Sequence, residues 1–193
     1  MTAPVYVVDT SSIIELFHIT PIDRYRSFWD EFTQKFRELV DTGRMIVLDV
    51  VYNEVNHDAI GSTADSDDPI VKWMKQWEHN IISLGISHYQ RVVEILEKFP
   101  TSANIDKVPP AADPFLITYV LEEREQERLD GVLPDYVIVT QEKRNPNQRK
   151  KMEQLRKKSG IIPEITKLPS ICDYYRIETL DYLGLFRTEN WVF

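Results

Sequence analysis

The sequence of 193 residues has one cysteine, Cys172, and no apolar run long enough to span a membrane. A single cysteine excludes an internal disulfide and a cysteine-rich zinc site. A membrane-spanning helix needs roughly 18–20 apolar residues in a row, so a spanning segment is excluded as well. The amino-terminus has neither the basic flank nor the apolar segment of a signal peptide. We therefore expect a soluble, cytoplasmic protein that does not bind membranes.

The sequence also has no internal repeat, no low-complexity tract and no domain linker. Hydrophobic residues make up 42% and charged residues 28% of the chain, and at these values wholesale disorder is not expected. The chain is long enough to bury a core of its own. We therefore expect a single domain over residues 1–193.

Charge is distributed unevenly along the chain. The net charge is −8, which argues against a protein that coats nucleic acid nonspecifically. Basic residues nevertheless gather between residues 143 and 158, where Glu153 is the one acidic residue. Such a segment can contact phosphates, or it can be a solvated helix face or loop. The residues that we expect to contact RNA in the first case are Lys143, Arg144, Arg149, Lys150 and Lys151.

Short apolar runs separated by helical patterns predict the fold. The runs that suit strands lie at residues 6–8, 45–48, 136–139 and 177–179. Between them, apolar residues recur at helical spacing. Strands that alternate with helices are typical of a parallel sheet covered on both faces. We therefore expect a three-layer α/β/α fold with a central parallel sheet.

Hydroxyl and acidic residues indicate where helices begin. Thr20, followed by a proline, predicts one helix start. Ser87 predicts another, and Asp113 a third, in a helix that ends near Arg124. The aromatic side chains that recur at helical spacing from residue 25 to residue 36 are expected to be core rather than a surface for stacking.

Four acidic residues lie at or just after the end of a predicted strand, or in the first turns of a predicted helix, one of which follows a proline-rich crossover. They are Asp9, Glu54, Asp113 and Glu142. In a right-handed parallel sheet every strand-to-helix turn lies at the same edge, so these side chains are expected to meet. Two carboxylates about 4 Å apart repel by roughly 4 kcal/mol at an effective dielectric of about 20. A divalent ion removes that cost, and Mg²⁺ or Mn²⁺ suits a site of oxygen ligands without histidine or cysteine.

A site of this kind can hydrolyse phosphodiester bonds. A bound metal ion lowers the pKa of its water and a second can stabilise the leaving oxygen, so no covalent nucleophile is needed. The hydroxyls of Ser11 and Thr140 can orient the metal ligands. Taken singly, Asp113 can also be an ordinary helix cap, Glu54 an exposed helix residue and Glu142 a loop carboxylate beside a lysine.

Two other α/β classes also place an aspartate at the end of a strand. Phosphatases of the haloacid dehalogenase type need a second aspartate two residues later, where this chain has Ser11. Receiver-type phosphoacceptor domains need an adjacent acidic pair after the first strand, and this chain lacks it. We rank both classes below a metal-dependent nuclease.

Four segments follow one another along nearly the whole chain in a recognisable order. They are residues 7–12 (VVDTSS), 50–55 (VVYNEV), 112–117 (ADPFLI) and 137–142 (VIVTQE). Together they resemble the PIN-domain nucleases, and more closely the PIN-like proteins of bacteria and archaea grouped with VapC-type toxins. Residues 167–177 also resemble the closing segment of one PIN-like subgroup. The resemblance implies a PIN-like fold.

The resemblance further implies a metal-dependent ribonuclease with an acidic quartet. The quartet corresponds to Asp9, Glu54, Asp113 and Glu142, and the family's hydroxyl positions correspond to Ser11 and Thr140. Many relatives have an aspartate at the fourth acidic position, and Asp173 is an alternative to Glu142 there. Residues 61–80 and 143–160 are inserts relative to a minimal PIN domain.

Partners are also implied by the resemblance. Toxins of this type cut RNA and are held inactive by a cognate antitoxin protein, often as dimers or larger assemblies. We therefore expect RNA as the substrate, an antitoxin and a homodimer as partners, and Mg²⁺ or Mn²⁺ as the cofactor. The alternative is a catalytically silent PIN-like scaffold that binds RNA or protein, which would be expected to lack members of the quartet.

Overall fold

The computed structural model describes residues 3–60, 68–103, 110–130, 134–143, 154–155, 157, 160–163 and 165–193. Its elements in chain order are β1 (Val5–Val8), α1 (Thr10–Ile19), α2 (Arg26–Asp41), β2 (Met45–Ile46), α3 (Asp49–Ile60), α4 (Pro69–Lys75), the short 3₁₀ helix η1 (Glu78–Asn80), α5 (Ile86–Lys98), α6 (Asp113–Asp130), β3 (Tyr136–Val139), α8 (Leu168–Tyr175), β4 (Glu178–Leu180) and α9 (Tyr182–Thr188).

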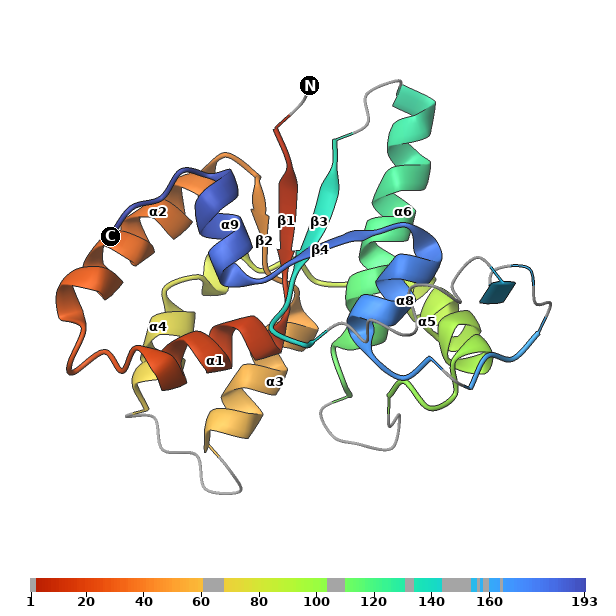
Figure 1. Ribbon diagram of the computed structural model, residues 1–193, viewed down its shortest axis with the longest axis horizontal. Coiled ribbons are helices and arrows are strands. Elements are labelled where there is room, and N and C mark those ends of the chain that lie inside the picture. Colours follow the sequence, from red (N-terminus) through yellow and green to blue (C-terminus); the bar gives the residue numbers. More distant parts are fainter. Residues whose placement is uncertain are drawn as a thin grey trace.

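The centre of the structure is a sheet of four parallel strands in the order β2-β1-β3-β4. Figure 1 shows helices on both sides of the sheet, with α2 and α9 on one side and α5, α6 and α8 on the other. The predicted three-layer α/β/α fold is therefore confirmed. No helix in the described ranges is both long enough and apolar enough to cross a membrane.

The pairing of β1 with β3 determines where the two strands end. Val8 of β1 lies beside Val139 of β3 at the last step of the register. Both strands are buried almost throughout, as expected for parallel strands that are covered on both faces. The next residues, Asp9 and Thr140, therefore follow at the same carboxyl edge. Because the chain leaves β1 for β2 on one side and β3 lies on the other, this edge is the switch point where open α/β sheets usually place their sites.

An aromatic cluster joins the helices on one side of the sheet. Trp29, Phe32 and Phe36 of α2 are at most 5% exposed. Their ring centroids lie 5.2 to 5.9 Å from that of Trp73 in α4. The prediction that the aromatic side chains between residues 25 and 36 belong to the core is confirmed for these three residues. Tyr25, the first of them, is instead 48% exposed.

Part of the predicted insert at residues 61–80 belongs to the core. Helix α4 begins after Asp68, whose carboxylate accepts the backbone N–H of Ile70 at 2.8 Å, and it buries Ile70 and Trp73. Residues 61–67 lie outside the described residues. Of the second insert, residues 143–160, the structure describes only positions 143, 154, 155, 157 and 160.

Two of the predicted helix starts are wrong. Thr20 ends α1 instead of beginning the next helix, because its hydroxyl and its backbone N–H both donate to the carbonyl of Leu16, at 2.6 and 2.9 Å. Helix α2 begins only at Arg26, after an intervening turn. Ser87 lies inside α5, whose N-cap is Gly85. A hydroxyl can satisfy carbonyls at a helix end as readily as N–H groups at a helix start, so the residue type alone did not distinguish the two ends.

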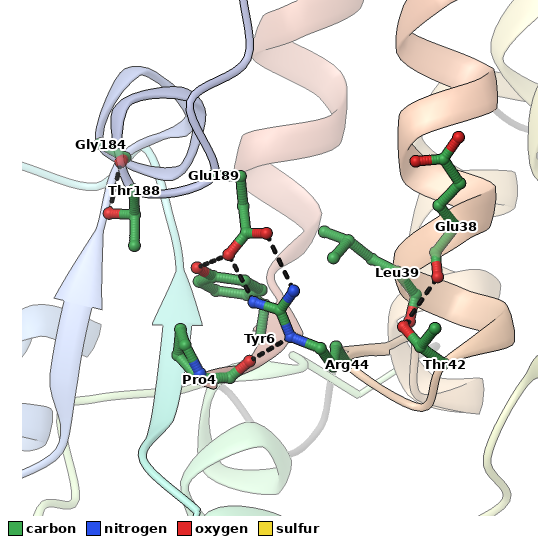
Figure 2. Close-up of polar contacts among 9 residues, drawn as sticks. All are labelled: Pro4, Tyr6, Glu38, Leu39, Thr42, Arg44, Gly184, Thr188 and Glu189. Carbon is green, nitrogen blue, oxygen red and sulfur yellow. Dashed lines mark hydrogen bonds and ion pairs between the residues drawn. The ribbon is translucent and has the colours of Figure 1, made fainter. Parts of the chain in front are cut away.

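A charged cluster ties the carboxyl-terminal segment to the amino-terminal end of the sheet (Figure 2). Glu189, just after α9, accepts hydrogen bonds from Nη1 of Arg44 at 2.9 Å and from the Tyr6 hydroxyl at 2.6 Å. Arg44 also donates from Nε to the carbonyl of Pro4 at 3.1 Å, and its guanidinium lies 5.8 Å from the centre of the Tyr6 ring. The cluster stabilises the end of the sheet that lies away from Asp9.

The charge of Glu189 depends on this cluster. Burial raises the pKa of Glu189, but the hydrogen bonds from Arg44 and Tyr6 outweigh burial, so the pKa is lowered below its usual 4.5. A carboxyl with a lowered folded-state pKa stabilises the fold above the unfolded pKa. That stabilisation is lost as the pH falls through the folded-state value.

We predict that Glu189→Gln lowers the free energy of unfolding at neutral pH by about 1–3 kcal/mol, because it removes the negative partner of a partly buried guanidinium. Chemical denaturation measures the difference from wild type, which should shrink as the pH falls below 4.5. Glu31→Gln is the control, because Glu31 pairs with Lys35 at 3.4 Å on an exposed face of α2 and should contribute less than about 1 kcal/mol. Equal losses of unfolding free energy in Glu189→Gln and Glu31→Gln would contradict the inference that the charged cluster stabilises the fold more than an exposed ion pair does.

Candidate active site

A pocket of about 490 Å³ lies at the carboxyl edge of β1 and β3. Figure 1 shows α1 and α3 near this end of β1. The residues that line the pocket include Asp9, Ser11, Glu54, Asp113 and Glu142, and we call it the acidic pocket. The structure thus brings together all four predicted acids, from the end of β1, from α3, from the start of α6 and from the segment after β3.

Asp9 directly follows β1 and is fixed by both backbone and side-chain bonds. Its N–H donates to the carbonyl of Val139 at 2.9 Å, and the residue is 3% exposed. The hydroxyls of Ser11 and Thr140 both donate to Oδ2 of Asp9, from 2.7 Å in the case of Thr140. No described residue donates to Oδ1, so this oxygen remains available for a ligand.

Backbone groups set the direction of these hydroxyl bonds. The N–H of Gln141 donates to Oγ of Ser11, and the N–H of Glu142 donates to Oγ1 of Thr140, both at 3.1 Å. Each hydroxyl oxygen thus accepts an N–H hydrogen bond, while its own proton is donated to the Asp9 carboxylate, which when ionised can only accept. The loop after β3 therefore orients the Asp9 carboxylate through both residues that the sequence suggested for this task.

Asp113 is the first residue of α6, in which the N–H groups of Phe115 and Leu116 donate to the carbonyl of Ala112. The helix continues to Asp130 instead of ending near Arg124 as expected. No described residue donates a hydrogen bond to the Asp113 carboxylate, which lines the acidic pocket. A helix cap would use this carboxylate to accept an N–H of the first turn, so capping does not account for it.

Two of the acids lie where ionisation is unfavourable. Burial raises the pKa of Asp9 to about 6, outweighing the hydrogen bonds from the two hydroxyls, and the charges of Glu142 and Glu54 add to the rise. Burial also raises the pKa of Asp113 well above its usual value, with further contributions from Asp9 and the two glutamates, whereas Lys167 opposes the rise. A cation in the pocket would favour the ionised form of both acids.

Glu54 lies in the second turn of α3 and is 9% exposed. Its Oε2 accepts a hydrogen bond from Oγ1 of Thr10, the first residue of α1, at 2.7 Å. Glu54 is therefore a buried carboxylate rather than the exposed helix residue that its position also allowed. The same bond links the start of α1 to α3.

The carboxylate of Glu142 is bound to the start of α8. The N–H of Leu168 donates to its Oε2 at 3.0 Å, and Nζ of Lys167 lies 3.4 Å from its Oε1. A negative charge is favoured at this end of a helix. Asp173, the alternative fourth acid, lies in the last turns of α8 and is not among the residues that line the acidic pocket.

The donor atoms of the acidic pocket suit a hard divalent ion. All of these ligand atoms are carboxylate oxygens. Neither Oδ1 of Asp9 nor the Asp113 carboxylate accepts a hydrogen bond from a described residue, and a buried anion without such a partner is costly. The side chains do not form a closed ligand shell: in the described part of the chain, no three His, Cys, Asp or Glu side chains are placed to hold one ion. Glu54 and Glu142 are engaged by Thr10 and by α8, which explains the open arrangement.

The sequence prediction omitted several residues at the acidic pocket. Glu15 and His18 line it, because they lie one and two turns after Ser11 on the same face of α1. That spacing is a signal that could have identified them. Lys167 does not line the pocket but lies against Glu142, which does. It has no comparable local signal, because the packing of α8 brings it there.

The structure describes one of the basic residues that we expected to contact RNA. Lys143 is exposed and lines a neighbouring cavity together with Thr140 and Asp181. Arg144, Arg149, Lys150 and Lys151 lie outside the described residues. Their contact with RNA therefore stays a prediction.

Comparison with known proteins gives one finding. A family model described as a domain of unknown function (DUF4411) matches residues 6–193. No curated protein and no solved structure matches the chain. The resemblance to PIN-domain nucleases stays a prediction.

We predict that Asp9→Asn raises the free energy of unfolding of the metal-free protein by about 1–3 kcal/mol above pH 6, because it removes a charge that burial disfavours. The pKa of Asp9 rises from 3.8 to about 6 on folding. Between these two pKa values the folded state binds more protons than the unfolded state, so the free energy of unfolding of the wild type should fall as the pH rises. The part of this pH dependence that comes from Asp9 should be absent from Asp9→Asn. Denaturation in a chelator across this pH range measures both effects.

Asp135→Asn is the matched control, because Asp135 is an exposed aspartate just before β3, at the opposite end of the strand. It should leave both the stability and its pH dependence close to those of wild type. If Asp9→Asn were destabilised and kept the wild-type pH dependence, the raised pKa of Asp9 would be contradicted.

Proposed function

The chain belongs to the DUF4411 family, whose description names no activity, and from the chemistry of its acidic pocket we propose that it is a divalent-metal-dependent endoribonuclease. The observation that supports this most is the meeting of four carboxylates at the switch point of the sheet. A purely structural role does not require acids that repel one another, since such an arrangement lowers stability.

Asp9 and Asp113, which have carboxylate oxygens without a hydrogen-bond donor among the described residues, would hold the ion. Glu54 and Glu142 are the other two acids of the site. Mg²⁺ or Mn²⁺ bound there would supply an activated water and neutralise charge on the phosphodiester. Asp9 contributes an oxygen of fixed orientation, because its other oxygen is bound by Ser11 and Thr140.

The choice of RNA as the substrate rests on the resemblance to PIN-domain nucleases. An acidic protein with a net charge of −8 needs local positive charge to bind a polyanion. The basic residues between positions 143 and 158 would provide it. The same resemblance supports a toxin that is held inactive by an antitoxin protein and that forms a homodimer, and we include both partners in the proposal.

A catalytically silent scaffold is the second candidate function. The observation in its favour is the open arrangement of the acids, which in the described part of the chain forms no three-residue metal group. A scaffold that binds RNA or protein would retain the fold without needing Asp9 or Asp113 as ligands. Cleavage that depends on a metal and on these two residues separates the candidates.

We predict that the wild-type protein cleaves a mixed pool of RNA in millimolar Mg²⁺ or Mn²⁺ and that a chelator stops the reaction. Asp9→Asn and Asp113→Asn should each lower the rate at least about 100-fold, which corresponds to a loss of about 3 kcal/mol of transition-state stabilisation. Gel electrophoresis of end-labelled RNA measures the rate.

Asp135→Asn serves as the control again and should cleave like wild type. Wild type and Asp9→Asn cutting equally fast would indicate a contaminating nuclease. An intact RNA pool in both metals would reject the enzymatic proposal in favour of the scaffold.

A further inference from the structure

Lys167 places a positive charge beside the acidic pocket, against one of the carboxylates that line it. Its Nζ lies 3.4 Å from Oε1 of Glu142, and its charge also acts on Asp113. Lys167 is the residue before α8 and does not follow a strand. It therefore approaches Glu142 from an element that contributes none of the four acids.

The first turn of helix α8 fixes the backbone of Lys167. The Lys167 carbonyl accepts the N–H groups of Ser170 and Ile171, at 2.9 and 3.1 Å. Leu168 and Ile171 are at most 1% exposed, so the first turn of α8 is anchored. The Lys167 side chain is nevertheless 56% exposed. Its ammonium group is thus held near the pocket while remaining accessible to a ligand from solvent.

Glu142 connects the lysine to the helix. Its Oε2 accepts the N–H of Leu168 at 3.0 Å, while its Oε1 faces Nζ of Lys167. A solvent-exposed ion pair contributes little to stability, so Lys167 can exchange this carboxylate for another anion at low cost. The hydrogen bond to Leu168 would hold Glu142 in place during that exchange.

We propose that Lys167 binds a non-bridging phosphate oxygen of RNA at the acidic pocket, and that Glu142 positions Lys167 through the first turn of α8. This inference rests on the proposed ribonuclease function. RNA carries a negative charge on each phosphate, and the pocket that receives it is lined by four carboxylates. Lys167 already lies against one of these carboxylates, so a phosphate at the mouth of the pocket meets a cation as well as the acids.

The role of Glu142 differs here from that of a metal ligand. Both of its carboxylate oxygens have partners at the start of α8. As a positioning residue, Glu142 should affect RNA binding through Lys167. The effects of Glu142→Ala and Lys167→Met on RNA affinity should therefore not be additive. A residue that acted only through the metal would have the same effect with or without Lys167.

The test is RNA binding by the full-length protein, measured as fluorescence anisotropy of a labelled single-stranded oligonucleotide. Ca²⁺ replaces Mg²⁺ in this assay, and gels check that the oligonucleotide stays intact. Lys167→Met removes the charge and Lys167→Arg keeps it. Lys75→Met is the control, because Lys75 is exposed on α4 and its loss changes the net charge equally.

Lys167→Met should weaken RNA binding about 10-fold and reduce the slope of log K against log salt concentration by about 0.7, the value for one phosphate contact on a single strand. Lys167→Arg should restore both values to near those of wild type, and Lys75→Met should change neither. Glu142→Ala should weaken binding in the wild-type background and add less than about twofold to the effect of Lys167→Met.

An unchanged affinity and salt slope in Lys167→Met would overturn the phosphate contact, even if its melting temperature were lower. Equal effects of Glu142→Ala in both backgrounds would overturn the positioning role. If the wild-type protein cleaves RNA and Lys167→Met binds RNA with the wild-type affinity and salt slope, this inference alone fails. If the wild-type protein neither binds nor cleaves RNA, the proposed function fails together with the inference.

Discussion

The parallel pairing of β1 with β3 is the constraint on which the acidic pocket depends. It ends both strands at the same edge and places Asp9 beside Thr140. The N–H groups after Thr140 then direct two hydroxyls at one oxygen of Asp9. Helices bring the other groups to this edge: α3 carries Glu54, α6 carries Asp113 and the start of α8 carries Lys167. Apolar packing of these helices thus holds like charges together against their repulsion.

Aromatic packing and an ion pair stabilise the fold away from the acidic pocket. The aromatic cluster between α2 and α4 buries large rings on one side of the sheet. At the far end, the pair between Arg44 and Glu189 closes the carboxyl-terminal segment onto β1. At the acidic edge, by contrast, four carboxylates meet, and the charges of Asp9, Glu54 and Glu142 act unfavourably on the ionised form of Asp113. Such an imbalance is typical of sites that bind a cation or a charged ligand.

Much of the fold and of the site was predictable, because both depend on patterns that are local in the chain. Uninterrupted apolar runs indicated parallel strands, and acids at or after strand ends indicated a shared edge. The predicted helix starts at Thr20 and Ser87 were wrong, because a hydroxyl residue can lie at either end of a helix or inside it. The engagement of Glu142 and the approach of Lys167 were not predictable. Both depend on how α8 packs against the loop after β3, and no local pattern encodes that packing.

Diffraction from crystals grown in millimolar Mn²⁺ tests the central claim most directly, because the anomalous signal locates the ion without reference to activity. We expect a peak within about 2.0–2.5 Å of oxygens from both Asp9 and Asp113, the range for carboxylate ligands of a hard divalent ion. The absence of a peak from the acidic pocket, or a peak held only by other residues, would contradict the account.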